Sequence, residues 1–145
     1  MRENLPDLVI SGINGDPNLG IDWLFSGTIG AARIAAFVGL PSIAISGLDD
    51  NMPGAVEAAA QWVVRLAQSP IVRQLQSFQY LTVSIPRIMP SEIKGIKVAK
   101  RGLVLRTPVL RKASEDSIDN RTEIWRLQGF EEIESPILTD SDIAL

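Results

Sequence analysis

Short apolar segments and helically spaced apolar positions alternate along the first half of the chain. The apolar run Leu8–Ile10 and the segment Ser42–Ser46 lie next to glycine or proline, which predicts two buried parallel strands. Between them, Ser26 can cap a helix that runs to about Val38, where Gly39 would end it. Strand, helix and strand in this order predict a βαβ unit with a right-handed crossover.

The pattern continues with a second helix and a third strand, and then becomes richer in extended segments. Apolar residues recur at helical spacing over Ala55–Gln68, which predicts a helix packed on the sheet. Tyr80–Ile85 predicts a third strand, and Ile96–Arg101 and Thr122–Leu127 predict strands beyond it. The polar stretch Ala113–Arg121 predicts a loop between these last two strands.

These elements predict an α/β fold in a single domain over residues 1–145. Residues 1–86 would form an α/β core of βαβ units with a mostly parallel sheet. Residues 87–145 would form an extended β arm that ends in an acidic tail. We expect no second, independent domain.

Composition removes several kinds of chemistry. The 145 residues contain no cysteine and no histidine, which excludes disulfides, thiolate nucleophiles, Cys/His zinc sites and imidazole acid–base catalysis by these residues. Any hydrolysis would use carboxylates, hydroxyls, amides and a hard metal. The cysteine-free sequence is compatible with the cytoplasm, and the apolar run Ile34–Leu48 is broken by glycine and proline, so we expect no membrane span.

Charge is unevenly distributed although its sum is small. The net charge of −3 argues against general nucleic-acid binding. A basic stretch precedes the acidic segment that begins at Glu115. It could be a solvated surface or a patch that attracts phosphate-bearing substrates. Its members are Lys94, Lys97, Lys100, Arg101, Arg106, Arg111 and Lys112.

Two positions carry candidate chemistry, each with an ordinary structural alternative. Asn14 follows a buried strand, so its amide oxygen could bind a divalent cation or its side chain could hydrogen-bond to its own loop. Ser26, Gly27 and Thr28 place two hydroxyls and backbone amides at a helix N-terminus. That arrangement suits a phosphate, and it also suits simple N-capping.

The order and spacing of these motifs resemble the SurE family of metal-dependent nucleotidases. The segments that carry the resemblance are Ser11–Asn14, Asn18–Gly20, Phe25–Ala32, Gly39–Ser46, Leu81–Pro86 and Ile93–Val98. Matches extend from Pro6 to about Gly102, with a looser similarity over Thr122–Gly129.

The resemblance implies a Rossmann-like core with a β arm that forms dimers or tetramers. It implies hydrolysis of nucleoside monophosphates to nucleoside and phosphate with one divalent metal, Mg²⁺ or Mn²⁺, per subunit. By position, Asn14 matches the family's asparagine metal ligand. Ser26, Gly27 and Thr28 match its phosphate-binding segment.

The sequence also departs from the family pattern. The family's Asn-Asp-Asp-Gly motif, which supplies two carboxylate ligands on the first strand, would precede Pro6 and is missing. Ile34 stands where relatives carry glutamate, and Thr82 and Ser84 replace two asparagines. We therefore expect a SurE-type core truncated at both ends, with impaired catalysis. The alternative is a non-catalytic remnant or an α/β module that binds phosphate or a partner.

Overall fold

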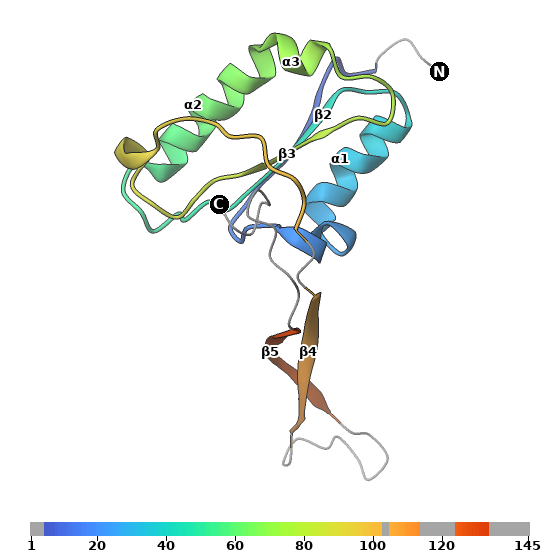
Figure 1. The fold of residues 1–145 in the computed structure, drawn as a ribbon, viewed down its shortest axis with the longest axis vertical. Coiled ribbons are helices and arrows are strands. Elements are labelled where there is room, and N and C mark those ends of the chain that lie inside the picture. The colour runs from blue at the N-terminus through green and yellow to red at the C-terminus, as the bar shows by residue number, and fades with distance from the viewer. Residues whose placement is uncertain (1–4, 103–104, 114–123, 134–145) are drawn as a thin grey trace. The chain divides into compact units, whose positions relative to one another are not determined.

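The structure, a computed structural model, describes residues 5–102, 105–113 and 124–133 (Figure 1). The chain divides into two compact units, residues 1–98 and residues 99–145. The first unit contains the sheet and all the helices among the described residues. Its elements are β1 (Val9–Asn14), η1 (Gly20–Leu24), α1 (Gly27–Phe37), β2 (Ser42–Ser46), α2 (Ala55–Gln68), α3 (Pro70–Arg73), β3 (Leu81–Ser84) and η2 (Pro90–Glu92).

The sheet of the first unit is parallel, with strand order β1-β2-β3. The central strand β2 is buried along its whole length because it has a strand on each side and a helix layer on each face. All three strands point the same way, so their C-terminal ends lie at one end of the sheet. Parallel sheets bind their ligands at this end.

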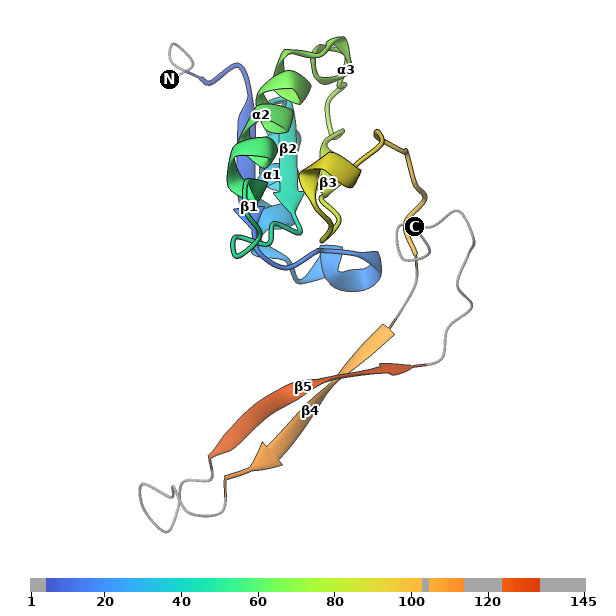
Figure 2. The same ribbon diagram turned by 90° about the vertical axis from the view of Figure 1, so that its left-hand side faces the viewer.

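Helices cover both faces of the sheet (Figure 2). On one face, Ile29 and Ala32 of α1 pack against Ala44 of β2. On the other face, Ile43 and Ile45 of β2 pack against Val72, with side chains of α2 around them. The alternation of residues along β2 therefore decides which helix each side chain meets, as the two-residue period of a strand requires.

One buried hydrogen bond and one glycine fix how β2 meets its neighbours. The fully buried Ser42 donates through Oγ to the carbonyl of Ala32 at 2.7 Å, which ties β2 to α1. Gly47 adopts a φ of +93°, and a Cβ at this position would collide with the carbonyl oxygen of Ile85. Only glycine allows this left-handed turn so close to the backbone after β3.

The second unit contains an antiparallel pair, β4 (Leu105–Lys112) and β5 (Trp125–Ile133). The register shifts between Val109 and Leu110, which marks an irregularity in the ladder. Leu110 is paired with Leu127, and both side chains are more than half exposed at 53% and 56%.

Most of the elements expected in the first unit are confirmed. The helix Ala55–Gln68 and the strand Ser42–Ser46 have the expected bounds, and Ser26 caps α1. Short α3 was not expected. Among the described residues, no helix combines the length and apolar character that crossing a bilayer requires.

The expectation of a strand over Ile96–Arg101 is wrong. The segment forms no strand and has a single bridge residue at Lys100. Ile96 and Val98 are 91% and 90% exposed, so side-chain packing does not favour a strand there. Instead, the strand over Leu105–Lys112 pairs with β5, which begins at Trp125, inside the strand expected over Thr122–Leu127. The polar segment 114–121 and most of the expected acidic tail lie outside the described residues.

Candidate functional site

Asn14 ends β1 directly beside Ser46, the last residue of β2. Its carbonyl oxygen accepts hydrogen bonds from the amides of Gly47 at 2.9 Å and Leu48 at 3.2 Å. Its side-chain Nδ2 donates to the carbonyl of Asp16 at 2.7 Å, which is the loop hydrogen bond expected as the alternative use of this residue. This bond uses only the nitrogen, so Oδ1 is the atom that a cation would contact.

Ser46 and Asn18 bring the next part of the loop to the same end of the sheet. The amide of Asn18 donates to Ser46 Oγ at 3.2 Å, although the two residues are 28 positions apart. The Nδ2 atom of Asn18 is buried and has no hydrogen-bond partner within the described part of the chain. An unsatisfied buried donor costs about 1–3 kcal/mol, so this atom is a candidate contact for a bound ligand.

Ser26, Gly27 and Thr28 form the beginning of α1. Ser26 Oγ accepts a hydrogen bond from the amide of Ile29 at 3.1 Å, and Ser26 has an extended backbone as an N-cap requires. A Cβ added to Gly27 would have no neighbour within 4 Å, so the approach to this turn is open. The α1 N-terminus therefore combines an open approach with the positive end of a helix of 11 residues.

Arg87 connects the segment after β3 to the loop after β1. Its Nη2 lies 2.8 Å from Asp16 Oδ1 and also donates to the carbonyl of Gly15 at 3.2 Å. The two charged side chains are 52% and 88% exposed. Arg87 thus contacts the loop that carries Asn14 at two points and neutralises the Asp16 carboxylate within it.

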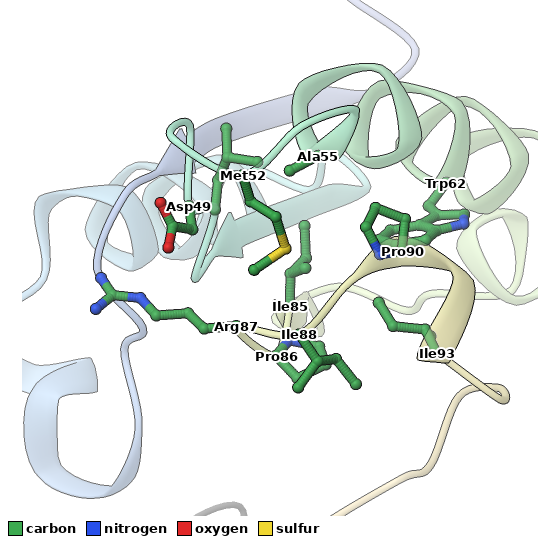
Figure 3. Close-up of a pocket in the computed structure, with 11 residues that line it drawn as sticks. Asp49, Met52, Ala55, Trp62, Ile85, Pro86, Arg87, Ile88, Pro90 and Ile93 are labelled. Atoms are coloured by element: carbon green, nitrogen blue, oxygen red, sulfur yellow. The ribbon is translucent and has the colours of Figure 1, made fainter.

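An apolar hollow adjoins this loop (Figure 3). The two charged residues that line the hollow, Asp49 and Arg87, lie on one side of it, and the Arg87 guanidinium extends away from the apolar side chains. The rest of the lining comes from the segment after β2, from α2 and from the segment after β3. The lining residues are Leu48, Asp49, Met52, Ala55, Trp62, Ile85, Pro86, Arg87, Ile88, Pro90 and Ile93.

The described residues alone do not fit a divalent metal. They include no group of three or more histidine, cysteine, aspartate or glutamate side chains that could hold one. Asn14 offers a neutral amide oxygen, and the carboxylate of Asp16 is paired with Arg87. Magnesium and similar hard cations require several oxygen ligands, usually with carboxylates among them. A metal at this end of the sheet therefore needs carboxylates from outside the described residues.

Known proteins are similar to this chain in both sequence and fold. The family model described as survival protein SurE matches residues 1–106. The chain belongs to the SurE family. It is 34% identical over 126 residues to the 5′-nucleotidase SurE of Desulfatibacillum aliphaticivorans, an alignment that covers 87% of this chain and 48% of the relative. The crystal structure of the SurE protein from Aquifex aeolicus matches with a TM-score of 0.66 and 33% identity, covering 97% of this chain and 54% of that chain.

The SurE assignment confirms the resemblance and the α/β fold expected from the motifs. The chain spans about half the length of the relatives it matches. The structure places Asn14 and the turn Ser26–Thr28 at the same end of the sheet, as the βαβ order predicts.

Sequence reasoning missed the contacts of Arg87 with the candidate site. A signal for Arg87 was present, because it follows Pro86 directly after the third predicted strand. Residues beyond the C-terminal ends of parallel strands often reach the binding site. The partner of Arg87 lies 71 positions away and could not be identified from spacing.

Proposed function

We propose that this chain carries the phosphate-binding part of a SurE nucleotidase site, which hydrolyses nucleoside monophosphates to nucleoside and phosphate. The observation that supports this most strongly is the capped, open N-terminus of α1 at the sheet end that also holds Asn14. The family assignment and the name of the Desulfatibacillum relative support phosphoric monoester hydrolysis as the reaction.

In this proposal the site residues have distinct tasks. The hydroxyls of Ser26 and Thr28 and the amides of the first turn of α1 hold the phosphate, because a helix N-terminus favours an anion. Gly27 leaves room for its oxygens. Asn14 Oδ1 would be one ligand of a divalent metal, Mg²⁺ or Mn²⁺, of which each subunit would hold one.

The metal requires additional ligands, so we propose that the 145 residues alone have impaired catalysis. A neutral amide does not compete with water for a hard divalent cation. The carboxylates would come from outside the residues that the structure describes. Within this proposal the protein acts in the cytoplasm as a homo-oligomer, a dimer or a tetramer.

The second candidate is a non-catalytic module that binds phosphate or a partner through the turn Ser26–Thr28. The lack of an acidic cluster among the described residues favours it, as does the pairing of Asp16 with Arg87. This candidate differs from the first in one measurable respect, because an anion site at a helix N-terminus needs no cation.

The experiment that tests the proposal is binding and hydrolysis of 5′-AMP by the folded chain, with and without Mn²⁺. The matched pair is the native chain and Asn14→Ala, with circular dichroism to show that both are folded. Under our proposal the chain alone binds AMP at the α1 N-terminus without Mn²⁺ and turns it over slowly or not at all. Addition of the half of the Desulfatibacillum relative that lies outside the alignment should then produce Mn²⁺-dependent hydrolysis that requires Asn14.

Two outcomes would contradict the proposal. AMP binding without Mn²⁺-dependent hydrolysis, even with the complementary half added, would identify the non-catalytic module instead. Rapid Mn²⁺-dependent turnover that Asn14→Ala abolishes would show that these residues complete the site without further carboxylates.

A further inference from the structure

Two aromatic residues precede the α1 N-terminus, and their side chains have different surroundings. Trp23, in η1, packs against the apolar cluster that joins α1 to β2, and the Cζ atom of Arg33 lies 5.6 Å from the centroid of its ring. Phe25 follows η1 directly and is 83% exposed. A single exposed apolar residue needs no explanation by itself, so its position decides what Phe25 can do.

Hydrogen bonds fix the backbone at Phe25. The amides of Phe25 and Ser26 both donate to the carbonyl of Asp22, at 3.1 Å and 2.9 Å. Ser26 in turn accepts the cap hydrogen bond from Ile29. The Phe25 side chain therefore leaves the chain at a defined point, directly before the N-cap of α1.

The usual structural role of an apolar residue at this position is not open to Phe25. A residue that precedes an N-cap often packs against the fourth residue of the helix, an arrangement called the hydrophobic staple. Ser26 is the N-cap and α1 begins at Gly27, so the fourth residue is Gly30. Gly30 has no side chain to contact, and a Cβ built there meets nothing within 4 Å. Packing on α1 therefore does not account for an aromatic residue at position 25.

Phe25 is a direct neighbour of the proposed phosphate ligands. It precedes Ser26, and consecutive Cα atoms are about 3.8 Å apart. In a nucleoside monophosphate a single ribose separates the base from the phosphate. A residue that contacts the base must therefore lie close to the phosphate ligands without being one of them. Phe25 meets this condition, and aromatic side chains are the surfaces on which proteins stack bases.

We propose that the base of the nucleotide stacks on the Phe25 ring while its phosphate is held at the α1 N-terminus. The inference rests on the proposed function and deepens it, because it names the residue that distinguishes a nucleotide from a simpler phosphate ester. Every base has an aromatic face, so the ring accepts purines and pyrimidines. Sugar phosphates have no such face and gain nothing from Phe25.

Trp62 offers another aromatic surface, in the hollow of Figure 3. That hollow is formed in part by α2, which covers the face of the sheet opposite to α1. A base in the hollow would therefore lie on the other face of the sheet from the helix that holds the phosphate. Phe25 belongs to the same segment as the phosphate ligands, so the observations favour Phe25.

The test compares three ligands by calorimetry on the folded chain without metal: 5′-AMP, ribose 5-phosphate and inorganic phosphate. Because of stacking on an aromatic ring, we expect AMP to bind at least about fivefold more tightly than ribose 5-phosphate. Phe25→Ala should remove this advantage of AMP. The same variant should change the affinity for the other two ligands by less than about twofold, because neither of them contacts the ring.

Three further variants separate stacking from other effects of substitution, with circular dichroism to show that each is folded. Phe25→Tyr keeps an aromatic face and should keep the affinity for AMP. Phe25→Leu keeps an apolar side chain without that face and should lose most of the advantage of AMP. Phe37→Ala is the matched control, because Phe37 is also exposed, by 61%, and is the last residue of α1. It should leave the affinity for all three ligands unchanged.

The outcomes distinguish this inference from the proposed function. Equal affinities of the native chain for AMP and ribose 5-phosphate would overturn the inference alone, as would a Phe25→Leu variant that binds AMP as the native chain does. A loss of AMP affinity in Trp62→Ala and not in Phe25→Ala would place the base in the hollow instead. If none of the three ligands binds the native chain, the proposed function fails, and the inference that rests on it fails with it.

Discussion

Arg87 Nη2 lies 2.8 Å from Asp16 Oδ1 and so joins the segment after β3 to the loop after β1. The residues are 71 positions apart in the sequence, and the strand β2 separates their strands in the sheet. The second contact, from Arg87 to the Gly15 carbonyl, is on the same loop. This pair therefore orients the loop that carries Asn14 more than it stabilises the core.

We expect the Arg87–Asp16 pair to contribute little to stability. Both side chains are more than half exposed, and exposed ion pairs are worth about 0.2–1 kcal/mol. A double-mutant cycle with Arg87→Gln and Asp16→Asn, measured by urea unfolding, should give a coupling energy in that range. The coupling should fall in 1 M salt because exposed charges are screened. A coupling above about 2 kcal/mol that resists salt would show that the pair is a buried structural element.

The turn after β2 depends on glycine. Gly47→Ala should destabilise the protein by more than about 1 kcal/mol, because the residue has a φ of +93° and its new Cβ would meet the Ile85 carbonyl. The matched control is Gly30→Ala in the interior of α1, where a Cβ meets nothing within 4 Å. That substitution should stabilise the helix by about 0.5–1 kcal/mol. The measurement is the melting temperature of each variant, which should be lower for Gly47→Ala than for Gly30→Ala. Equal melting temperatures would contradict the assigned turn.

Ser26 can be tested separately as a helix cap and as a phosphate ligand. Ser26→Asn and Ser26→Asp both retain good N-caps, whereas Ser26→Ala should cost about 1 kcal/mol of stability. The carboxylate of Ser26→Asp would repel a phosphate at the same place. We expect Asn and Asp variants of similar stability, with weaker AMP binding by the Asp variant in calorimetry. Similar affinity of these two variants for AMP would restrict Ser26 to capping.

The first unit was predictable to a large degree because its signals are local. Ser26 as a cap, the apolar run Ser42–Ser46 and the helical spacing over Ala55–Gln68 each specify an element from neighbouring residues alone. The prediction of a strand over Ile96–Arg101 was wrong, because a short alternation of apolar and polar residues does not show whether a partner strand exists. The pairing of Leu105–Lys112 with β5 depends on contacts that are distant in sequence.

The candidate site was predictable only in part. The family motifs indicated Asn14 and Ser26–Thr28, and both lie at the C-terminal end of the parallel strands. The hydrogen bond from Asn14 Nδ2 to its own loop was expected as an alternative. The motifs did not reveal that Arg87 reaches the same loop. Such contacts depend on how separate loops meet after folding. Sequence spacing carries no information about those distances.

The β4–β5 pair exposes apolar side chains that a second copy of the chain could cover. Leu110 and Leu127 are cross-strand partners and are exposed by 53% and 56%, and Trp125 is exposed by 53%. A two-stranded hairpin is at best marginally stable alone, so association would both cover these residues and stabilise the pair.

We therefore expect Leu127→Glu to lower the oligomeric state of the folded chain, as measured by light scattering over a range of concentrations. A charge at an apolar contact must be desolvated when the interface forms, whereas the same charge is hydrated in a monomer. Gln128→Glu is the matched control, because Gln128 neighbours Leu127 in β5, is also exposed, and its side chain is polar already. It adds the same charge without removing an apolar contact. A native chain that is monomeric at all concentrations, or an oligomer unaffected by Leu127→Glu, would show that this pair of strands does not mediate association.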